Sequence, residues 1–60
     1  MKLKRLRRRK GLSQQALAQK AQTTQAYIAM LESEERTNPS LAVVKRLAKA
    51  LRVRVDELLG

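Results

Sequence analysis

The sequence predicts an all-α fold, a compact bundle of five short helices, and two observations support this prediction. Apolar residues recur at intervals of three and four along most of the chain, which is the repeat of an amphipathic helix. The glycines, Gly11 and Gly60, and the single proline, Pro39, fall between or after these helical patterns. A chain of 60 residues has room for one domain, which we assign to residues 1–60.

The first predicted helix covers residues 2–10, with Leu3 and Leu6 on its inward face. We expect Gly11 to end this helix, because only glycine adopts a left-handed conformation at low cost. Ser13 is expected to begin the second helix, since its hydroxyl can accept a hydrogen bond from an amide of the first turn. The inward face of this second helix consists of Leu17, Ala18 and Ala21.

The second and third predicted helices are separated only by a short polar segment, residues 22–24. One of the two threonines in this segment is expected to cap the third helix, which places Ile28 and Leu31 on its inward face. Ala18 lies where two steeply crossing helices would touch, and its small side chain lets the backbones approach. This combination predicts a helix-turn-helix, with a short and mostly uncharged outer face on the third helix.

Two further helices are predicted after a polar loop at residues 33–39. Ser40 is expected to cap the fourth helix, over residues 41–51, and a last short helix covers residues 55–59, where the dipole favours the two acids of its first turn. We expect the core to include Leu41, Val44, Leu47, Ala48 and Leu51 of the fourth helix and Leu58 and Leu59 of the last one.

The charge of the chain is unevenly distributed. The formal net charge is +9, and the first 20 residues carry eight basic residues and no acid. Such a positive field concentrates polyanions near the surface, which favours an anionic partner. The alternative is a solvated basic surface that serves solubility alone, although a balanced mixture of lysine and glutamate achieves this without the asymmetry.

Composition argues against several function classes. The chain has no cysteine and no histidine, so we expect no disulfide, no metal site and no cofactor. Its carboxylates form no clustered pair for acid and base chemistry, so we expect no enzyme activity. The absence of an 18-residue apolar run and of a signal-peptide pattern predicts a soluble, cytoplasmic protein, and the start, MKLKRLRRRK, has too narrow an apolar face for membrane insertion.

The chain resembles the phage repressor and Cro-type helix-turn-helix domain over nearly its full length. The resemblance lies in four stretches in the family's order and spacing: KGLSQQALAQKA, TTQAYIAMLE, NPSLAVVKRLAKAL and VDELL. It implies a lambda-repressor-like bundle whose third helix, about Gln25–Glu32, enters the major groove of double-stranded DNA, usually as a homodimer on a palindromic operator. The implied function is sequence-specific regulation of transcription.

The resemblance also implies which residues contact the bases. Gln25 opens the third helix, and its carboxamide can bond N6 and N7 of adenine together. Thr24 precedes it, and Ala26, Tyr27 and Met30 fill the other base-facing positions, where they can touch thymine methyl groups. For Tyr27 the alternative is packing between helices. Because the outer face of the third helix has no arginine, we expect a half-site richer in A·T than in G·C pairs.

Phosphate contacts are implied at the start of the second helix, where Gln14 stands beside Ser13. A helix N-terminus offers free amides and a partial positive charge to an anion. The resemblance further implies an ion pair between Arg7 and Glu32, which would tie the first helix to the end of the third. The remaining phosphate candidates follow the third helix and are Ser33, Arg36 and Asn38.

The sequence departs from the family's pattern at several turns. The family favours glycine where Gln22 and Arg52 stand, glycine or asparagine at Glu34, and a serine cap at Arg54. A left-handed conformation at the first three positions would cost about 1 kcal/mol each relative to glycine. Glu34 and its neighbour Glu35 also lie in a loop that approaches the DNA backbone in relatives, so they either point away or lower non-specific affinity.

Other functions compete with this interpretation. The domain can instead serve as a DNA-binding antitoxin, although little chain follows the last helix to wrap a toxin, or as the N-terminal domain fragment of a larger regulator. Binding to single-stranded RNA usually needs several stacking aromatics, and Tyr27 is the only one here. Nothing in the sequence suggests a small-molecule ligand. Candidate positions for a dimer interface are Val43, Val53 and Leu59.

Overall fold

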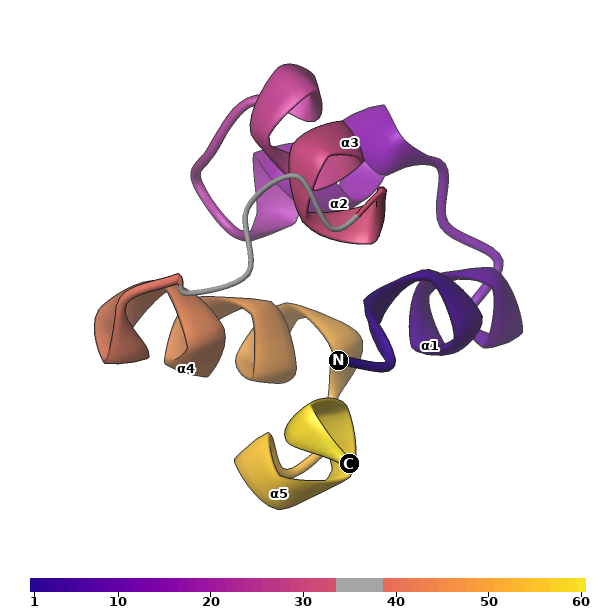
Figure 1. Cartoon of the computed structure of the whole chain (residues 1–60). Helices are drawn as coiled ribbons and strands as arrows, with labels where there is room; N and C mark the ends of the chain where they lie inside the picture. The colour runs from indigo at the N-terminus through magenta and orange to yellow at the C-terminus, as the bar shows by residue number, and fades with distance from the viewer. Residues whose placement is uncertain (34–38) are drawn as a thin grey trace.

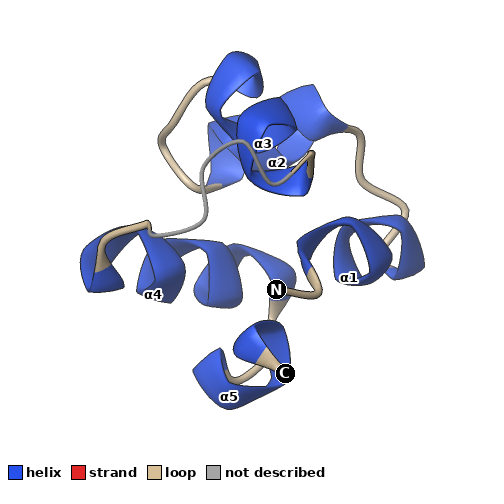
Figure 2. Ribbon diagram, viewed as in Figure 1, coloured by secondary structure: helices blue, strands red, loops and turns tan. Residues whose placement is uncertain are grey.

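The computed structural model describes residues 1–33 and 39–60, and these residues form five helices and no strand (Figures 1 and 2). The all-α fold class predicted from the sequence is therefore confirmed. The Cα radius of gyration is 9.8 Å, and the principal extents are 23 × 23 × 18 Å. The helices are α1 (Leu3–Arg9), α2 (Gln14–Lys20), α3 (Gln25–Glu32), α4 (Leu41–Leu51) and α5 (Val55–Leu59).

Hydroxyl side chains begin three of the helices at the predicted positions. Each hydroxyl accepts a hydrogen bond from the amide three residues later, which pairs a group that the helix itself leaves unpaired. Of the two threonines before α3, Thr24 provides the cap. The pairs are Ser13 Oγ with the Ala16 amide at 3.0 Å, Thr24 Oγ1 with Tyr27 at 3.1 Å, and Ser40 Oγ with Val43 at 3.3 Å.

Three helices end in the same way, with a residue in the left-handed conformation. These residues are Gly11 after α1, Gln22 after α2 and Arg52 after α4, with φ of 71°, 58° and 57°. Two backbone hydrogen bonds close each end, in the pattern of a Schellman motif. The bonds run from Gly11 to Arg8 and Leu12 to Arg7, from Gln22 to Gln19 and Thr23 to Ala18, and from Arg52 to Lys49 and Val53 to Ala48.

Helix α5 begins without the serine that the family favours. Arg54 stands at its N-cap, and its guanidinium donates to both carboxylate oxygens of Asp56, at 3.1 and 2.9 Å. The Glu57 carboxylate accepts the Arg54 amide at 3.5 Å, which is one half of a capping box. The acids of the first turn thus take over part of the capping role.

The hydrophobic core lies where the five helices meet. Each fully buried leucine or isoleucine stabilises the fold by about 1.5 to 3 kcal/mol relative to an exposed one. The Lys2 amide also donates to the Leu58 carbonyl at 2.8 Å, which ties the start of the chain to α5. The buried residues are Leu3, Leu6, Leu17, Ala18, Ala21, Ile28, Leu31, Val44, Leu47, Ala48, Leu51 and Leu58.

Two of the predicted core positions are wrong. Leu41 is 60% exposed, because it is the first residue of α4 and that end of the helix lies far from α1 and α5 (Figure 1). Leu59 is 54% exposed. Successive side chains of a helix point about 100° apart, so Leu59 points toward solvent when Leu58 points into the core. Within the described residues, no helix is long and apolar enough to cross a membrane.

Candidate nucleic-acid interface

The two faces of α3 differ sharply in burial. Ile28 and Leu31 are buried in the core, where α3 packs against α2. Thr24, Gln25 and Ala26 are exposed at the beginning of the same helix. The N-terminal turn of α3 therefore presents one amide and one methyl side chain to solvent, on a helix whose other face is held in place.

Tyr27 and Met30 occupy an intermediate position. Both are partly buried, and Tyr27 packs against the hydrophobic core cluster. Part of the Tyr27 side chain therefore packs against the core, which is the alternative to a base contact. Partial burial leaves the remainder of each side chain at the surface, beside the exposed start of α3.

The structure brings Arg7 and Glu32 together as a bidentate pair. Arg7 Nε lies 2.5 Å from Glu32 Oε2, and Arg7 Nη2 lies 3.1 Å from Oε1. The two side chains are only 10% and 4% exposed. Arg7 Nη1 also donates to the Leu12 carbonyl at 2.7 Å, so the guanidinium links α1 to both the following loop and the end of α3. A planar guanidinium fits this geometry better than an ammonium would.

Gln14 completes this network, in a role that the sequence reasoning missed. Its Nε2 donates to Glu32 Oε1 at 3.1 Å, so α1, α2 and α3 all meet at one carboxylate. The carboxamide nitrogen carries two N–H groups, so the implied phosphate contact of Gln14 would use the one that does not donate to Glu32. No sequence signal separates the two roles, since both need an amide at the start of α2.

The network shifts the pKa of both charged partners. Burial would raise the pKa of Glu32, but hydrogen bonds from Arg7 and Gln14 and attraction to Arg7 and Lys4 outweigh it and lower this pKa below its ordinary value. The hydrogen bond to Glu32 raises the pKa of Arg7 against the opposing effect of burial. Both groups are therefore charged at neutral pH, and the carboxylate contributes to stability in its ionised form.

The other predicted phosphate contacts are distributed around the start and end of the helix pair. Ser13 is exposed, and its Oγ accepts the capping bond described above. Ser33 is exposed at the end of α3, and its hydroxyl donates to the Met30 carbonyl at 3.2 Å. Arg36 and Asn38, together with the two acids Glu34 and Glu35, lie outside the described residues.

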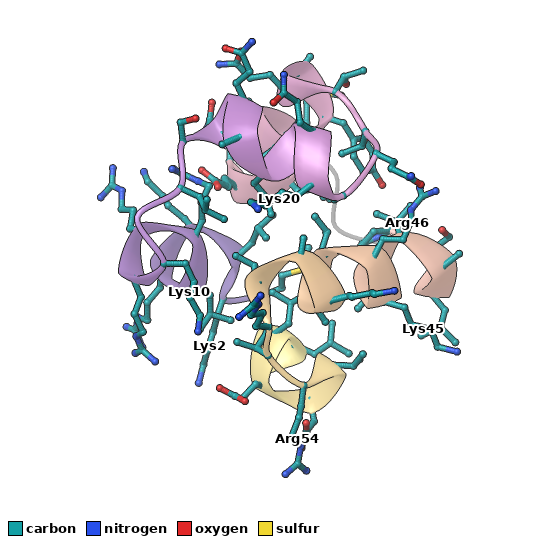
Figure 3. The ribbon with its side chains drawn as sticks, turned by 180° about the vertical axis from the view of Figure 1, so that it is seen from behind. Lys2, Lys10, Lys20, Lys45, Arg46 and Arg54 are labelled. Carbon is teal, nitrogen blue, oxygen red and sulfur yellow. The ribbon has the colours of Figure 1, made fainter. Side chains whose placement is uncertain are left out.

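Most of the positive charge in the described part of the chain has no acidic partner. Among the lysines and arginines of residues 1–33 and 39–60, only Arg7 and Arg54 form ion pairs. Exposed basic side chains project from α1, α2 and α4, and Figure 3 shows several of them from behind. The basic surface predicted from the sequence is therefore present and largely unneutralised.

Helix α2, the left-handed turn at Gln22 and helix α3 with its exposed first turn together define a helix-turn-helix. A family profile described as helix-turn-helix matches residues 3–58. The chain belongs to the phage repressor and Cro-type helix-turn-helix family, a family of DNA-binding transcriptional regulators and not a class of enzymes.

Curated relatives match almost the whole chain. It is 36% identical over 59 residues to the immunity repressor protein of Bacillus phage phi105, covering 98% of this chain and 40% of that protein. It is 34% identical to the HTH-type transcriptional regulator SinR of Bacillus licheniformis, over 98% of this chain and 53% of that protein, and 34% identical to SinR of Bacillus subtilis, over 97% and 52%. The chain spans about half the length of these relatives. No solved structure matches it at a comparable significance.

Proposed function

We propose that this chain regulates transcription by placing α3 in the major groove of an operator in double-stranded DNA. The observation that carries the proposal is the exposed start of α3, with Thr24, Gln25 and Ala26 at the surface of a helix anchored by Ile28 and Leu31. An α-helix fits the major groove, and the N-terminal residues of a recognition helix reach the base edges. Membership in the family and the unpaired basic surface support the same interpretation.

The proposed base contacts follow from the chemistry of these side chains. Gln25 can donate to N7 and accept from N6 of an adenine, whereas Ala26 and Met30 offer apolar contact to thymine. The exposed part of the Tyr27 side chain adds to this base-contacting surface, and Thr24 lies next to it at the N-cap of α3. Since α3 contains no lysine or arginine, it has no preferred partner for guanine, and the half-site is A·T-rich at the positions beneath it.

Phosphate contacts on both sides of the groove position the helix. The start of α2 supplies Ser13 and Gln14, and the segment after α3 supplies Ser33, Arg36 and Asn38. Two copies of the chain bind a palindromic site in this proposal, as a two-fold dimer. Leu59 is the candidate interface position with a largely exposed side chain, whereas Val43 and Val53 pack in part against the core.

The proposal is tested by selecting sites from a random duplex pool at about 0.1 M salt and measuring affinity by gel shift. We expect an A·T-rich palindrome, and we expect Gln25→Ala to weaken binding to it by about 1 to 3 kcal/mol. Gln19→Ala, which removes an exposed amide from α2, is the matched control and leaves affinity unchanged. A guanine-rich core, or equal binding to duplex RNA in competition, contradicts the proposal.

A further inference from the structure

A pocket of about 220 Å³ lies between the end of α2 and the C-terminal half of α4. Three of its five lining residues are basic and none is acidic. Gln22, in its left-handed turn, and the small Ala50 complete the wall. The lining residues are Lys20, Gln22, Arg46, Lys49 and Ala50.

The three cations of this pocket have no anionic partner among the described residues. Lys20, Arg46 and Lys49 are exposed and form no ion pair. Figure 3 shows Arg46 on the side of α4 nearer to α2, whereas the adjacent Lys45 points to the opposite side. Like charges that converge on one hollow repel each other, and an anion bound between them relieves this repulsion.

Helix dipoles explain only part of this arrangement. Lys20 and Lys49 stand in the last turns of α2 and α4, where a cation is favoured next to the unpaired carbonyl groups. Arg46 lies in the middle of α4, so no helix end accounts for it. The dipoles also do not explain why cations from two helices border the same pocket.

We propose that this pocket binds a phosphate group. Its volume is below the 300 to 1,000 Å³ or so that drug-sized ligands occupy, so it suits one compact anion and not a whole nucleotide. Arg46 offers a fork of donors that matches two phosphate oxygens, and the lysines add point charges. The group can belong to a free phosphate-bearing solute or to a DNA backbone.

The position of the pocket separates it from the interface proposed above. It lies at the end of α2 opposite to Ser13 and Gln14, roughly 9 Å along the helix axis. A phosphate bound at the start of α2 therefore does not itself occupy the pocket. The inference stands on the pocket alone and does not require the proposed operator binding.

The test is an NMR titration of the 60-residue chain with inorganic phosphate, compared with sodium chloride at equal ionic strength. We expect saturable shifts of the Gln22 and Ala50 amides with phosphate only. Arg46→Gln and Lys49→Gln should each weaken binding about tenfold, because a hydrogen bond to a charged group is lost. Lys45→Gln removes the same charge from the opposite side of α4 and should leave binding unchanged.

Two results would overturn the inference. Shifts that fail to saturate, or that chloride reproduces, would mean that the pocket holds only a diffuse ion atmosphere. Equal weakening by Lys45→Gln would mean that net charge, and not the pocket, attracts phosphate. Addition of a random-sequence duplex then identifies the source: displacement of phosphate assigns the pocket to the DNA backbone, and simultaneous binding assigns it to a free solute.

Discussion

Glu32 links α3 to the two helices that precede it in the chain. Its carboxylate accepts hydrogen bonds from Arg7 of α1 and Gln14 of α2, while it belongs to the last turn of α3 itself. Removing one partner of such a pair leaves the other charge buried and unpaired, which costs more than the pair contributes. The network therefore fixes α1, α2 and α3 relative to one another.

Arg7→Ala should lower the free energy of unfolding by about 3 kcal/mol, because it leaves the Glu32 carboxylate without its main partner. Urea denaturation measures the change. Arg8→Ala is the control, since Arg8 is exposed and forms no ion pair, and it should stay within about 0.5 kcal/mol of the parent chain. Equal effects of the two substitutions would show that the pair contributes little.

Acid should destabilise the fold through the same carboxylate. The pKa of Glu32 is lowered in the folded state, so its stabilising contribution is complete above the ordinary glutamate pKa of about 4.3. Below this pH the unfolded chain takes up a proton more readily than the folded one, and the contribution is lost as the pH falls through the folded-state pKa. Urea denaturation between pH 7 and pH 3 should show this loss.

Glu32→Gln is the control for the pH dependence. It has no carboxylate at this position, so its stability should change less between pH 5 and pH 3 than that of the parent chain. The exposed acids Asp56 and Glu57 are present in both proteins, so they do not account for a difference between the two curves. Parallel curves for parent and variant would mean that Glu32 is not the group responsible.

At the scale of the helices, turns decide where each element stops. Gly11, Gln22 and Arg52 share one conformation and one hydrogen-bond pattern, although only one of them is glycine. A side chain in the left-handed region brings Cβ close to the carbonyl oxygen, which costs about 1 to 2 kcal/mol. Two of the three helix ends therefore carry strain that the packing of the core offsets.

Gln22→Gly and Arg52→Gly should each raise the free energy of unfolding by about 1 kcal/mol, because glycine removes the backbone strain. The greater conformational entropy of glycine in the unfolded chain cancels only part of this gain. Thermal and urea denaturation measure both variants. Gly11→Ala is the inverse experiment: a Cβ at this position meets no atom within 4 Å, so any destabilisation comes from the backbone. Stability that is unchanged in all three would refute the strain.

At the scale of the whole molecule, charge dominates the expected behaviour toward DNA. The chain has a net charge of +9, and most lysines and arginines of residues 1–33 and 39–60 are exposed and form no ion pair. Each phosphate that such a side chain neutralises releases condensed counterions from DNA. The proposed binding thus combines a general electrostatic contribution with a smaller one from the base contacts of α3.

Affinity for the selected operator should fall as salt rises, with a slope of log K against log salt of about −0.9 for each phosphate neutralised. Gln25→Ala should reduce affinity and leave this slope unchanged, because it removes a base contact and no phosphate contact. Filter binding or fluorescence anisotropy at salt concentrations between about 50 and 200 mM measures both the affinity and the slope. A change of slope in Gln25→Ala would place that residue against the backbone instead.

The sequence by itself determined the helices, their caps and most of the core, because these depend on local periodicity and on side chains within three residues of each other. Ser13, Thr24 and Ser40 cap the helices that their positions predict. The family resemblance led to Arg7 and Glu32, and the bundle brings them together across 25 positions of the chain.

Only the tertiary structure decided the features that depend on distant segments. Leu41 and Leu59 share the apolar pattern of their helices, but no neighbouring helix covers them, so periodicity placed them wrongly. The bond from Gln14 to Glu32 and the basic pocket between α2 and α4 are likewise absent from any local pattern. Local rules set which face of a helix is apolar, whereas the packing of other helices sets how much of that face is buried.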